Sequence, residues 1–197
     1  MADEETMRVY AAQAEVYATK FPGGDDPHLE RFLDVLQKGA RILDLGCGPG
    51  KAAARMMARG FAALAWDASP EFVAWARDTY GVQAEVAEFS ALNAVAEFDA
   101  IYANFSLLHA PKAQMPAHLA RIATALTPGG RFHIGTKTGT GEKRDALGRF
   151  YAYYEGAELT GLLEQAGFVV DYRKTGAETG LDGTRAPWII LQAIKND

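Results

Sequence analysis

Short apolar runs alternate along this chain with longer segments in which apolar residues recur every three or four positions. The runs predict strands over residues 41–45, 62–66, 82–87, 99–105 and 130–136. The periodic segments predict helices between them, at about 51–59, 70–79 and 111–126. Alternation of strand and amphipathic helix is typical of an α/β fold, so we expect a doubly wound, mainly parallel sheet with helices on both faces.

The two ends of the chain depart from this alternation. Helical spacing over residues 3–21 and again over 28–38 predicts two helices before the first strand. Residues 137–155 show no clear period, and a predicted helix at 157–166 follows them. Two apolar runs, at 168–174 and 187–195, then come with no helix between them, which predicts a closing antiparallel hairpin.

The composition narrows the class of protein. With 197 residues, of which 49% are hydrophobic, the chain can bury one full core and is expected to form a single domain. A net charge of −5, with no basic run longer than two residues, argues against nucleic acid or an anionic membrane as partner. The chain starts without an apolar leader and contains no run of about 18 apolar residues, so we expect a cytoplasmic protein that does not enter membranes.

Candidate chemistry begins in a glycine-rich turn, "DLGCGPG", at residues 44–50. Gly46, Gly48 and Gly50 directly follow a predicted strand and precede a predicted helix. Glycine allows positive φ and a close approach of ligand to backbone, and the free N–H groups of a helix start favour a polar or anionic ligand. Cys47, the only cysteine, is either a small residue in a crowded turn or a nucleophile activated by the helix start.

Two phosphate-binding turns fit this spacing less well. A P-loop requires a glycine and a serine or threonine where this chain has Leu45 and Ala52. A dinucleotide turn requires a third glycine, which would fall on Lys51 or, in a second register, on Ala53. The looser form of that motif tolerates alanine, so the dinucleotide interpretation is weakened and stays open.

The spacing Asp-x-Gly-x-Gly-x-Gly fits best, and with it the chain closely resembles the class I S-adenosylmethionine-dependent methyltransferases. The resemblance covers nearly the whole chain and implies a Rossmann-like sheet of seven strands with an antiparallel last strand. It implies that the methionine end of S-adenosylmethionine is wrapped by Asp44, Gly46, Cys47, Gly48 and Gly50. On this basis we expect one domain over 1–197, with N-terminal helices covering the site at 1–39, a cofactor-binding core at 40–137, a possible lid at 138–155, and a C-terminal helix and hairpin at 156–197.

Further cofactor contacts are expected after the second and third strands. Asp67, followed by Ala68, ends the second strand, where a carboxylate can accept hydrogen bonds from both ribose hydroxyls. The alternative for Asp67 is a helix N-cap, a role that Ser69 fills better. Glu88 and Phe89 match the family positions that reach the adenine amine and cover its ring; they are alternatively an exposed carboxylate and a core aromatic.

The reaction centre is expected after the fourth strand, because ligands of open α/β sheets bind at the carboxyl ends of strands. Asn104 is predicted to support the cofactor or the acceptor through its amide. His109 is the best-placed general base if the acceptor is a hydroxyl or a protonated amine; alternatively it is a turn residue before the next helix. His28 beside two aspartates resembles a metal ligand, but such closely spaced ligands can hardly face one ion, so no metal is predicted.

Aromatic and basic residues predict how the site is covered. A Gly-Glu-x-Arg-Asp pattern at 141–145 resembles small bacterial members of the family, in which the first helix and this segment cover the active site. Tyr17 is assigned to the cofactor, and Tyr10, Arg144, Arg149 and Tyr151 are assigned to the acceptor. The alternative is a static loop whose aromatic residues fill the core.

The function expected from these features is methyl transfer from S-adenosylmethionine to a small-molecule acceptor by in-line displacement. One rival is a nicotinamide-dependent oxidoreductase, which also needs a glycine turn and an acid after the second strand. Another is a non-catalytic S-adenosylmethionine-binding module that regulates a partner. The identity of the acceptor cannot be read from the residues, and the chain is expected to be a monomer or a homodimer.

Overall fold

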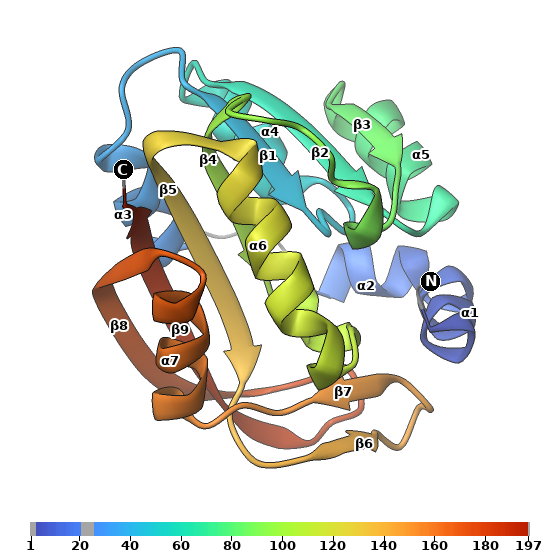
Figure 1. Ribbon diagram of the computed structural model, residues 1–197. Helices are drawn as coiled ribbons and strands as arrows, with labels where there is room; N and C mark the ends of the chain where they lie inside the picture. The colour runs from blue at the N-terminus through green and yellow to red at the C-terminus, as the bar shows by residue number, and fades with distance from the viewer. Residues whose placement is uncertain (1–2, 21–25, 197) are drawn as a thin grey trace.

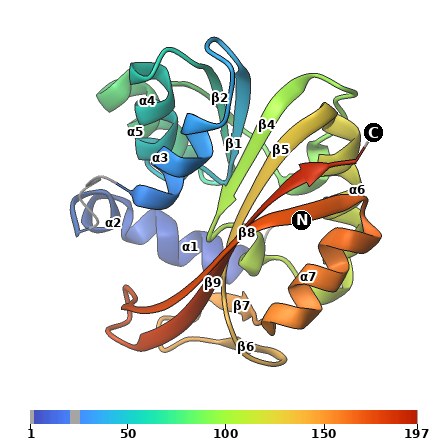
Figure 2. The ribbon, with the colours of Figure 1, turned by 90° about the vertical axis from the view of Figure 1, so that its left-hand side faces the viewer.

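The computed structural model describes residues 3–20 and 26–196. Its centre is a seven-stranded sheet in the order β3-β2-β1-β4-β5-β9-β8 (Figures 1 and 2). The strands are β1 (Arg41–Leu45), β2 (Ala62–Asp67), β3 (Gln83–Val86), β4 (Phe98–Asn104), β5 (Leu126–Lys137), β8 (Phe168–Thr179) and β9 (Arg185–Lys195). Neighbouring strands from β3 to β5 are parallel, whereas β9 is antiparallel to both β5 and β8. The mainly parallel sheet with a reversed last strand is thus confirmed.

Helices cover both faces of this sheet. One face carries α3 (Pro27–Asp34), α4 (Lys51–Ala58) and α5 (Pro70–Tyr80), and the other carries α6 (Met115–Ala125) and α7 (Gly156–Gln165). Successive side chains of a strand point to opposite faces, and β1 shows the result. Ile42 lies in a buried cluster with Phe32 and Met56, whereas Leu43 lies in the cluster that contains Leu119 and Leu163.

The remaining elements gather around the carboxyl edge of the parallel strands, where ligands of such sheets bind (Figure 1). They are the helices α1 (Glu4–Ala12) and α2 (Ala14–Lys20), the short turns η1 (Phe89–Ala91), η2 (Leu107–His109) and η3 (Lys112–Gln114), and the strands β6 (Glu142–Arg144) and β7 (Phe150–Ala152). β6 and β7 pair as an antiparallel hairpin, separate from the main sheet.

Two predicted helices differ from the helices observed. The segment predicted as one helix over 3–21 forms two helices that part at Gln13, where a φ of −119° and a ψ of 15° leave the helical conformation and end α1. The helix predicted over 111–126 begins as the single turn η3 and becomes α-helical only at Met115. Pro116 lies in the first turn of α6, where a missing N–H costs nothing.

The prediction of an irregular segment at 137–155 is wrong in part, because this segment contains the β6–β7 hairpin. Asp145 closes the hairpin: its Oδ1 accepts hydrogen bonds from the N–H groups of Leu147 and Arg149. Gly148 adds a positive φ of 92° in the same turn. Periodicity missed the hairpin because all three residues of β6 are polar and exposed, which leaves no apolar alternation to detect.

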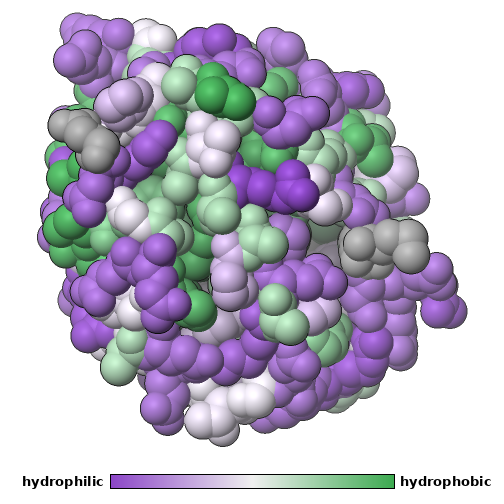
Figure 3. Space-filling view, viewed as in Figure 1, coloured by the Kyte–Doolittle hydropathy of each residue, from purple (hydrophilic) through white to green (hydrophobic). Residues whose placement is uncertain are grey.

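The face of the molecule drawn in Figure 3 is mainly polar. Hydrophilic residues cover most of the face in Figure 3, and apolar residues lie between them in small groups. Within residues 3–20 and 26–196, each helix is too short or too polar to cross a bilayer.

Candidate functional site

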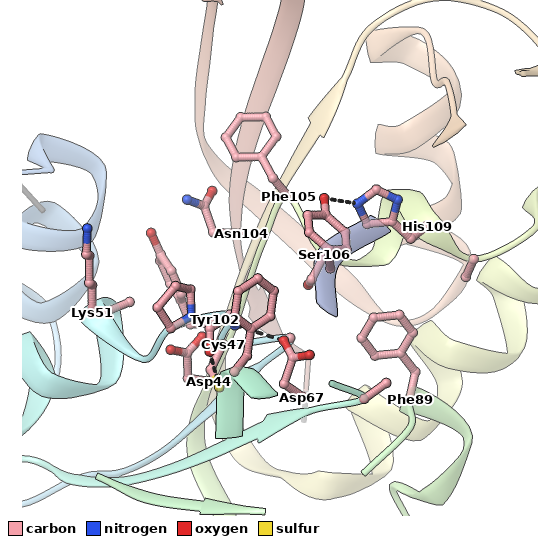
Figure 4. Close-up of a pocket in the computed structure, with 18 of the residues that line it drawn as sticks. Asp44, Cys47, Lys51, Asp67, Phe89, Tyr102, Asn104, Phe105, Ser106 and His109 are labelled. Carbon is pink, nitrogen blue, oxygen red and sulfur yellow. Dashed lines mark hydrogen bonds between the residues drawn. The ribbon is translucent and has the colours of Figure 1, made fainter. Parts of the chain in front are cut away.

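A cavity of about 610 Å³ opens at the carboxyl ends of β1, β2 and β4 (Figure 4). Its walls come from α1, α3, the glycine turn, the tip of β2, η1 and the loop after β4. Small-molecule sites have volumes of about 300–1,000 Å³, so this cavity is large enough for a substantial ligand. In Figure 4, Asp44 and Asp67 lie on one side of it, and Asn104 and Phe105 lie across from them.

The glycine turn is shaped by backbone conformation and by tight packing. Gly46, Gly48 and Gly50 have φ values of 82°, 52° and 84°, a region that side chains rarely adopt. A Cβ at Gly46 would lie 2.2 Å from the Cβ of Ser106, and one at Gly50 would lie 2.5 Å from the Cβ of Ala76. The turn therefore requires glycine at these two positions because of the protein's own packing, whether or not a ligand is bound.

Asp67 links this turn to the next helix. Its Oδ2 accepts a hydrogen bond of 2.8 Å from Gly48 N–H, and its Oδ1 accepts one of 2.8 Å from Ser69 N–H. Ser69 in turn caps α5, because its hydroxyl accepts a hydrogen bond from Phe72 N–H. The predicted N-cap is thus Ser69, and each oxygen of Asp67 retains a lone pair for a second donor. Ribose binding by Asp67 and Ala68, both in the cavity wall, stays a prediction.

Asp44 is a buried carboxylate in the cavity wall. It is 2% exposed, and its Oδ2 has no hydrogen-bond partner among the described residues. Burial and, to a lesser extent, the nearby charge of Asp67 raise the pKa of Asp44 to about 7. A buried polar atom without a partner calls for an explanation, and a ligand that presents a cation or a donor to Oδ2 supplies one.

Cys47 is not arranged as a nucleophile. Its thiol donates a 3.4 Å hydrogen bond to the carbonyl of Gly48. Burial strongly raises the pKa of the Cys47 thiol, and the neighbouring carboxylates Asp44 and Asp67 raise it further. A neutral thiol is a poor nucleophile, so the small residue in a crowded turn is the better interpretation.

Glu88 and Phe89 line the cavity at η1, on the side of the tips of β2 and β3. Glu88 Oε2 accepts a 3.3 Å hydrogen bond from the hydroxyl of Ser90. The ring of Phe89 lies edge-on to His118, with 5.7 Å between ring centroids. His118 of α6, which the sequence analysis did not single out, also lines the cavity, and in the described structure neither of its buried ring nitrogens has a partner. Adenine contacts by Glu88 and Phe89 stay a prediction.

Asn104 and Phe105 form the far wall, at the end of β4. Asn104 Oδ1 accepts a 3.1 Å hydrogen bond from Nε2 of the buried His133. Phe105 has a φ of 54°, which is uncommon for a residue other than glycine, and its N–H donates to the carbonyl of Gly135. Such strain is often held at functional sites, and here it turns the chain directly after Asn104.

His109 reaches the cavity together with Tyr10. Its Nδ1 lies 2.7 Å from the carbonyl oxygen of Phe150, which can only accept, so Nδ1 carries the proton. Its Nε2 therefore accepts the 2.8 Å hydrogen bond from the Tyr10 hydroxyl. Burial lowers the pKa of His109 to about 4, so the ring is neutral at physiological pH. The structure brings the predicted base and Tyr10 together, with the lone pair of His109 already engaged by the tyrosine.

The basic residues assigned to the acceptor lie outside the cavity wall, as does Tyr151. Arg144 forms a bidentate pair with Asp3 at 2.8 and 2.9 Å. Arg149 is 2% exposed and forms a bidentate pair with Asp145 at 2.6 and 2.9 Å. Of the four residues assigned to the acceptor, only Tyr10 lines the cavity.

Tyr151 and Tyr17 complete the account of the assigned residues. Tyr151 is buried behind His109, with 4.7 Å between the two ring centroids. Tyr17 belongs to α2, but its side chain lies outside the part of the chain that the structure describes.

Sequence reasoning also missed Tyr102, which lines the cavity from β4 and donates a 3.2 Å hydrogen bond to Asp26 of the α3 N-cap. Its position two residues before Asn104 is the signal that could have found it, because alternate residues of a strand share a face.

The fold, the glycine turn and Asp67 at the end of β2 are features shared by α/β proteins that bind nucleotide-type cofactors. Comparison with known proteins narrows this class. Residues 42–130 match the model of a family described as a methyltransferase domain. A trans-aconitate 2-methyltransferase of Mycobacterium sp. (strain KMS) is 38% identical over 105 residues, which cover 50% of this chain and 40% of that protein. The chain thus matches well under two thirds of the length of this curated relative.

Solved structures extend the likeness to the whole fold. The 1,6-didemethyltoxoflavin-N1-methyltransferase of Burkholderia thailandensis has a TM-score of 0.80 at 23% identity, over 98% of this chain and 88% of that one. The N-methyltransferase NodS of Bradyrhizobium japonicum has a TM-score of 0.76 at 15% identity, over 99% of this chain and all of that one (100%). These findings bear out the resemblance to the class I methyltransferases: residues 42–130 match a methyltransferase domain, and the fold of the whole chain is that of solved methyltransferases. Both of these solved structures contain bound S-adenosylhomocysteine.

Proposed function

We propose that this chain transfers the methyl group of S-adenosylmethionine to a small-molecule acceptor by in-line displacement. The observation that carries this proposal is a single cavity that extends from the glycine turn and Asp67 to Asn104, Phe105 and Tyr10. A donor at the first end and an acceptor at the second would lie side by side. Alignment of the two is the main requirement of such a displacement.

The cofactor end of the cavity fits the groups that S-adenosylmethionine carries. Asp44 offers a buried, unpartnered carboxylate oxygen to the ammonium group of the methionine end. Asp67 offers its remaining lone pairs to the ribose hydroxyls. Glu88 and Phe89 are placed to receive the adenine, the first through a carboxylate and the second through its ring.

The bound cofactor supplies an electrophilic methyl group on a sulfonium, so the chain itself needs to align, to exclude water and to remove a proton. α1 closes the cavity from one side with Thr6, Met7 and Tyr10. The β6–β7 hairpin holds α1 in place, because Phe150 N–H donates a 2.8 Å hydrogen bond to the hydroxyl of Thr6. Exclusion of water strengthens the electrostatic interactions inside the site and protects the sulfonium.

A proton released by the acceptor has a route through Tyr10 and His109. The neutral Nε2 of His109 accepts the Tyr10 hydroxyl hydrogen, so Tyr10 can receive a proton from the acceptor as it gives its own to His109. Because the pKa of His109 is only about 4, the ring would hold the accepted proton only briefly before releasing it. Acceptors that need no base would leave the pair with a positioning role only.

The acceptor is proposed to be a flat, largely uncharged molecule rather than a polycarboxylate. The relatives differ on this point, since one is named for trans-aconitate and another is solved with bound 1,6-didemethyltoxoflavin. Phe72, Tyr102 and Phe105 supply aromatic walls. Arg144 and Arg149, the two cations assigned to the acceptor, are each paired with an aspartate of this chain.

The test has two parts. Calorimetry should detect binding of S-adenosylhomocysteine, and no binding at millimolar ligand would refute the proposal. Transfer of a labelled methyl group to a library of heteroaromatic and polycarboxylate compounds should then favour the heteroaromatic ones. A nicotinamide enzyme would instead be stabilised by NAD in a thermal-shift assay, and a non-catalytic module would bind S-adenosylhomocysteine without ever methylating a library member.

A further inference from the structure

A row of polar side chains that do not line the cavity connects α3 to Asn104. Arg31 of α3 donates a 2.7 Å hydrogen bond to Oε1 of Gln192 on β9. Gln192 Nε2 lies 3.3 Å from Nδ1 of His133 on β5, and His133 Nε2 lies 3.1 Å from Oδ1 of Asn104. Both Gln192 and His133 are fully buried. The methyl-transfer roles proposed above use none of the three residues that lead to Asn104.

The chemistry at the far end of the row fixes the orientation of Gln192. A guanidinium can only donate, so the amide oxygen of Gln192 must face Arg31. The amide nitrogen then faces the other way, where it donates a 2.9 Å hydrogen bond to the carbonyl of His28, a group that can only accept. Both ends of the Gln192 amide are therefore determined by partners whose roles cannot be exchanged.

The same logic fixes the proton of His133. Because Gln192 presents N–H groups, Nδ1 of His133 must accept, and the single proton of a neutral ring must sit on Nε2. Burial lowers the pKa of His133 to about 3, which keeps the ring neutral. The ring is also held in its plane by stacking on Tyr102, with centroids 4.1 Å apart and an interplanar angle of 28°.

The proton on Nε2 decides which way Asn104 faces. Nε2–H donates to Oδ1 of Asn104, so the NH₂ group of that amide is directed away from His133. Gly135 makes room for this arrangement, because a Cβ there would lie 2.3 Å from the same oxygen. Asn104 lines the cavity beside Phe105 (Figure 4). This series of hydrogen bonds thus directs the NH₂ group of Asn104, a hydrogen-bond donor, to the wall formed by Asn104 and Phe105, where the methyl acceptor is proposed to bind.

We propose that His133 and Gln192 are positioning residues that hold Asn104 as a fixed donor, and that the site thereby selects acceptors with an unprotonated carbonyl oxygen or ring nitrogen. An acceptor that offers only N–H at this place would leave both groups without a partner, which is the costly outcome for buried polar groups. This inference rests on the proposed function, because it assumes that a methyl acceptor binds here. It adds that Asn104 donates, rather than accepts, the hydrogen bond to that acceptor.

The first test reads the proton directly. The chain has four histidines, and ¹⁵N spectra of the labelled protein should show opposite tautomers for two of them. His133 should carry its proton on Nε2 and His109 on Nδ1, so the second serves as an internal reference. A proton on Nδ1 of His133 would overturn the inference, because Asn104 would then have to turn its carbonyl to the cavity.

The second test reads selectivity with the cofactor site filled. With S-adenosylhomocysteine saturating, quinoline, which has a ring lone pair, should bind the wild-type protein about fivefold more tightly than indole, which has only N–H. Asn104→Leu and Gln192→Met should each bring this ratio close to one. The control is Gln83→Met on the exposed part of β3, which should keep the wild-type ratio.

The affinity for S-adenosylhomocysteine separates the possible failures. If the wild-type protein does not bind it, the proposed function itself fails. If it binds but Asn104→Leu lowers its affinity and leaves the quinoline-to-indole ratio unchanged, Asn104 serves the cofactor and the inference about the acceptor is wrong. Gln192→Met removes buried hydrogen bonds and can unfold the chain, whereas Asn104 is only partly buried, so Asn104→Leu keeps the test decisive.

Discussion

The two walls of the cavity are built in different ways. The cofactor wall depends largely on segments close in sequence: Asp67 Oδ2 and Gly48 N–H are 19 residues apart, although Gly46 also packs against the more distant Ser106. The acceptor wall is made by distant segments: Tyr10 and His109 are 99 residues apart, and Thr6 and Phe150 are 144 apart. The cofactor wall is therefore readable as a motif, whereas the acceptor wall exists only once α1 and the β6–β7 hairpin have met.

Charge is handled differently in the two walls as well. On the cofactor side, Asp44 keeps a carboxylate oxygen without a partner in the described structure. On the acceptor side, Arg144 is paired with Asp3, and Arg149 is paired with Asp145. This difference supports the proposal that the first wall receives a charged ligand, whereas the arginines of the second wall hold that wall together.

The largest effect is expected from Gly46→Ala, which tests whether the cofactor wall depends on its own packing. The new Cβ would meet Ser106 at 2.2 Å, at a φ of 82°. We expect a loss of about 3 kcal/mol or more in the free energy of unfolding, measured by denaturant titration. The control is Gly60→Ala, which has a similar φ of 85° but no neighbour within 4 Å and should cost only about 1 kcal/mol. Equal losses would mean that Ser106 can move aside.

Asp67→Ala should weaken binding of S-adenosylhomocysteine by at least about tenfold, because each charge-assisted hydrogen bond to ribose contributes about 1.5–3 kcal/mol. The variant also loses the bonds to Gly48 and Ser69, so the turn itself must be controlled. Ser69→Ala removes the cap of α5 and the 2.7 Å hydrogen bond from the Ser69 hydroxyl to Glu71, but it keeps both hydrogen bonds of Asp67. It should cost about 1 kcal/mol in stability and bind nearly as wild type. Calorimetry on both variants checks this; unchanged affinity in Asp67→Ala would exclude the ribose assignment.

The charge of Asp44 predicts a pH dependence of cofactor binding. Its pKa of about 7 means that the carboxylate is mostly protonated at pH 6 and mostly ionised at pH 8. Only the ionised form attracts an ammonium group. The ionised fraction of Asp44 rises about tenfold between pH 6 and pH 8, so the affinity for S-adenosylhomocysteine should rise by about the same factor. Asp44→Asn should remove the slope. A flat profile in the wild-type protein would place the ammonium group elsewhere.

The smallest effect is expected from Arg144→Ala, which tests whether the acceptor wall is latched by its charges. The pair with Asp3 is partly exposed, so its loss should lower the free energy of unfolding only slightly. Local opening should nevertheless increase, seen as faster hydrogen exchange in α1 and in the β6–β7 hairpin and unchanged exchange in β1. If S-adenosylhomocysteine slows exchange over 138–154, the segment acts as a lid; identical exchange with and without it would identify a static cover.

The sequence by itself determined the parts that depend on local backbone and periodicity. β1 spans the predicted 41–45 without a shift, and the predicted N-cap Ser69 caps α5. The glycine turn follows from the same local logic, because positive φ at three alternate positions leaves few other residues possible. These features need only neighbouring residues, so a motif is enough to predict them.

Only the tertiary structure decided how the side chains around the acceptor are used. Arg144 and Arg149 look equally available in the sequence, yet Asp3 lies 141 residues from the first and Asp145 only four from the second. The direction of the Asn104 amide likewise depends on Arg31, Gln192 and His133, which come from three separate elements. Hydrogen bonds and ion pairs act over a few ångströms, and sequence distance says little about which groups the folded chain brings that close.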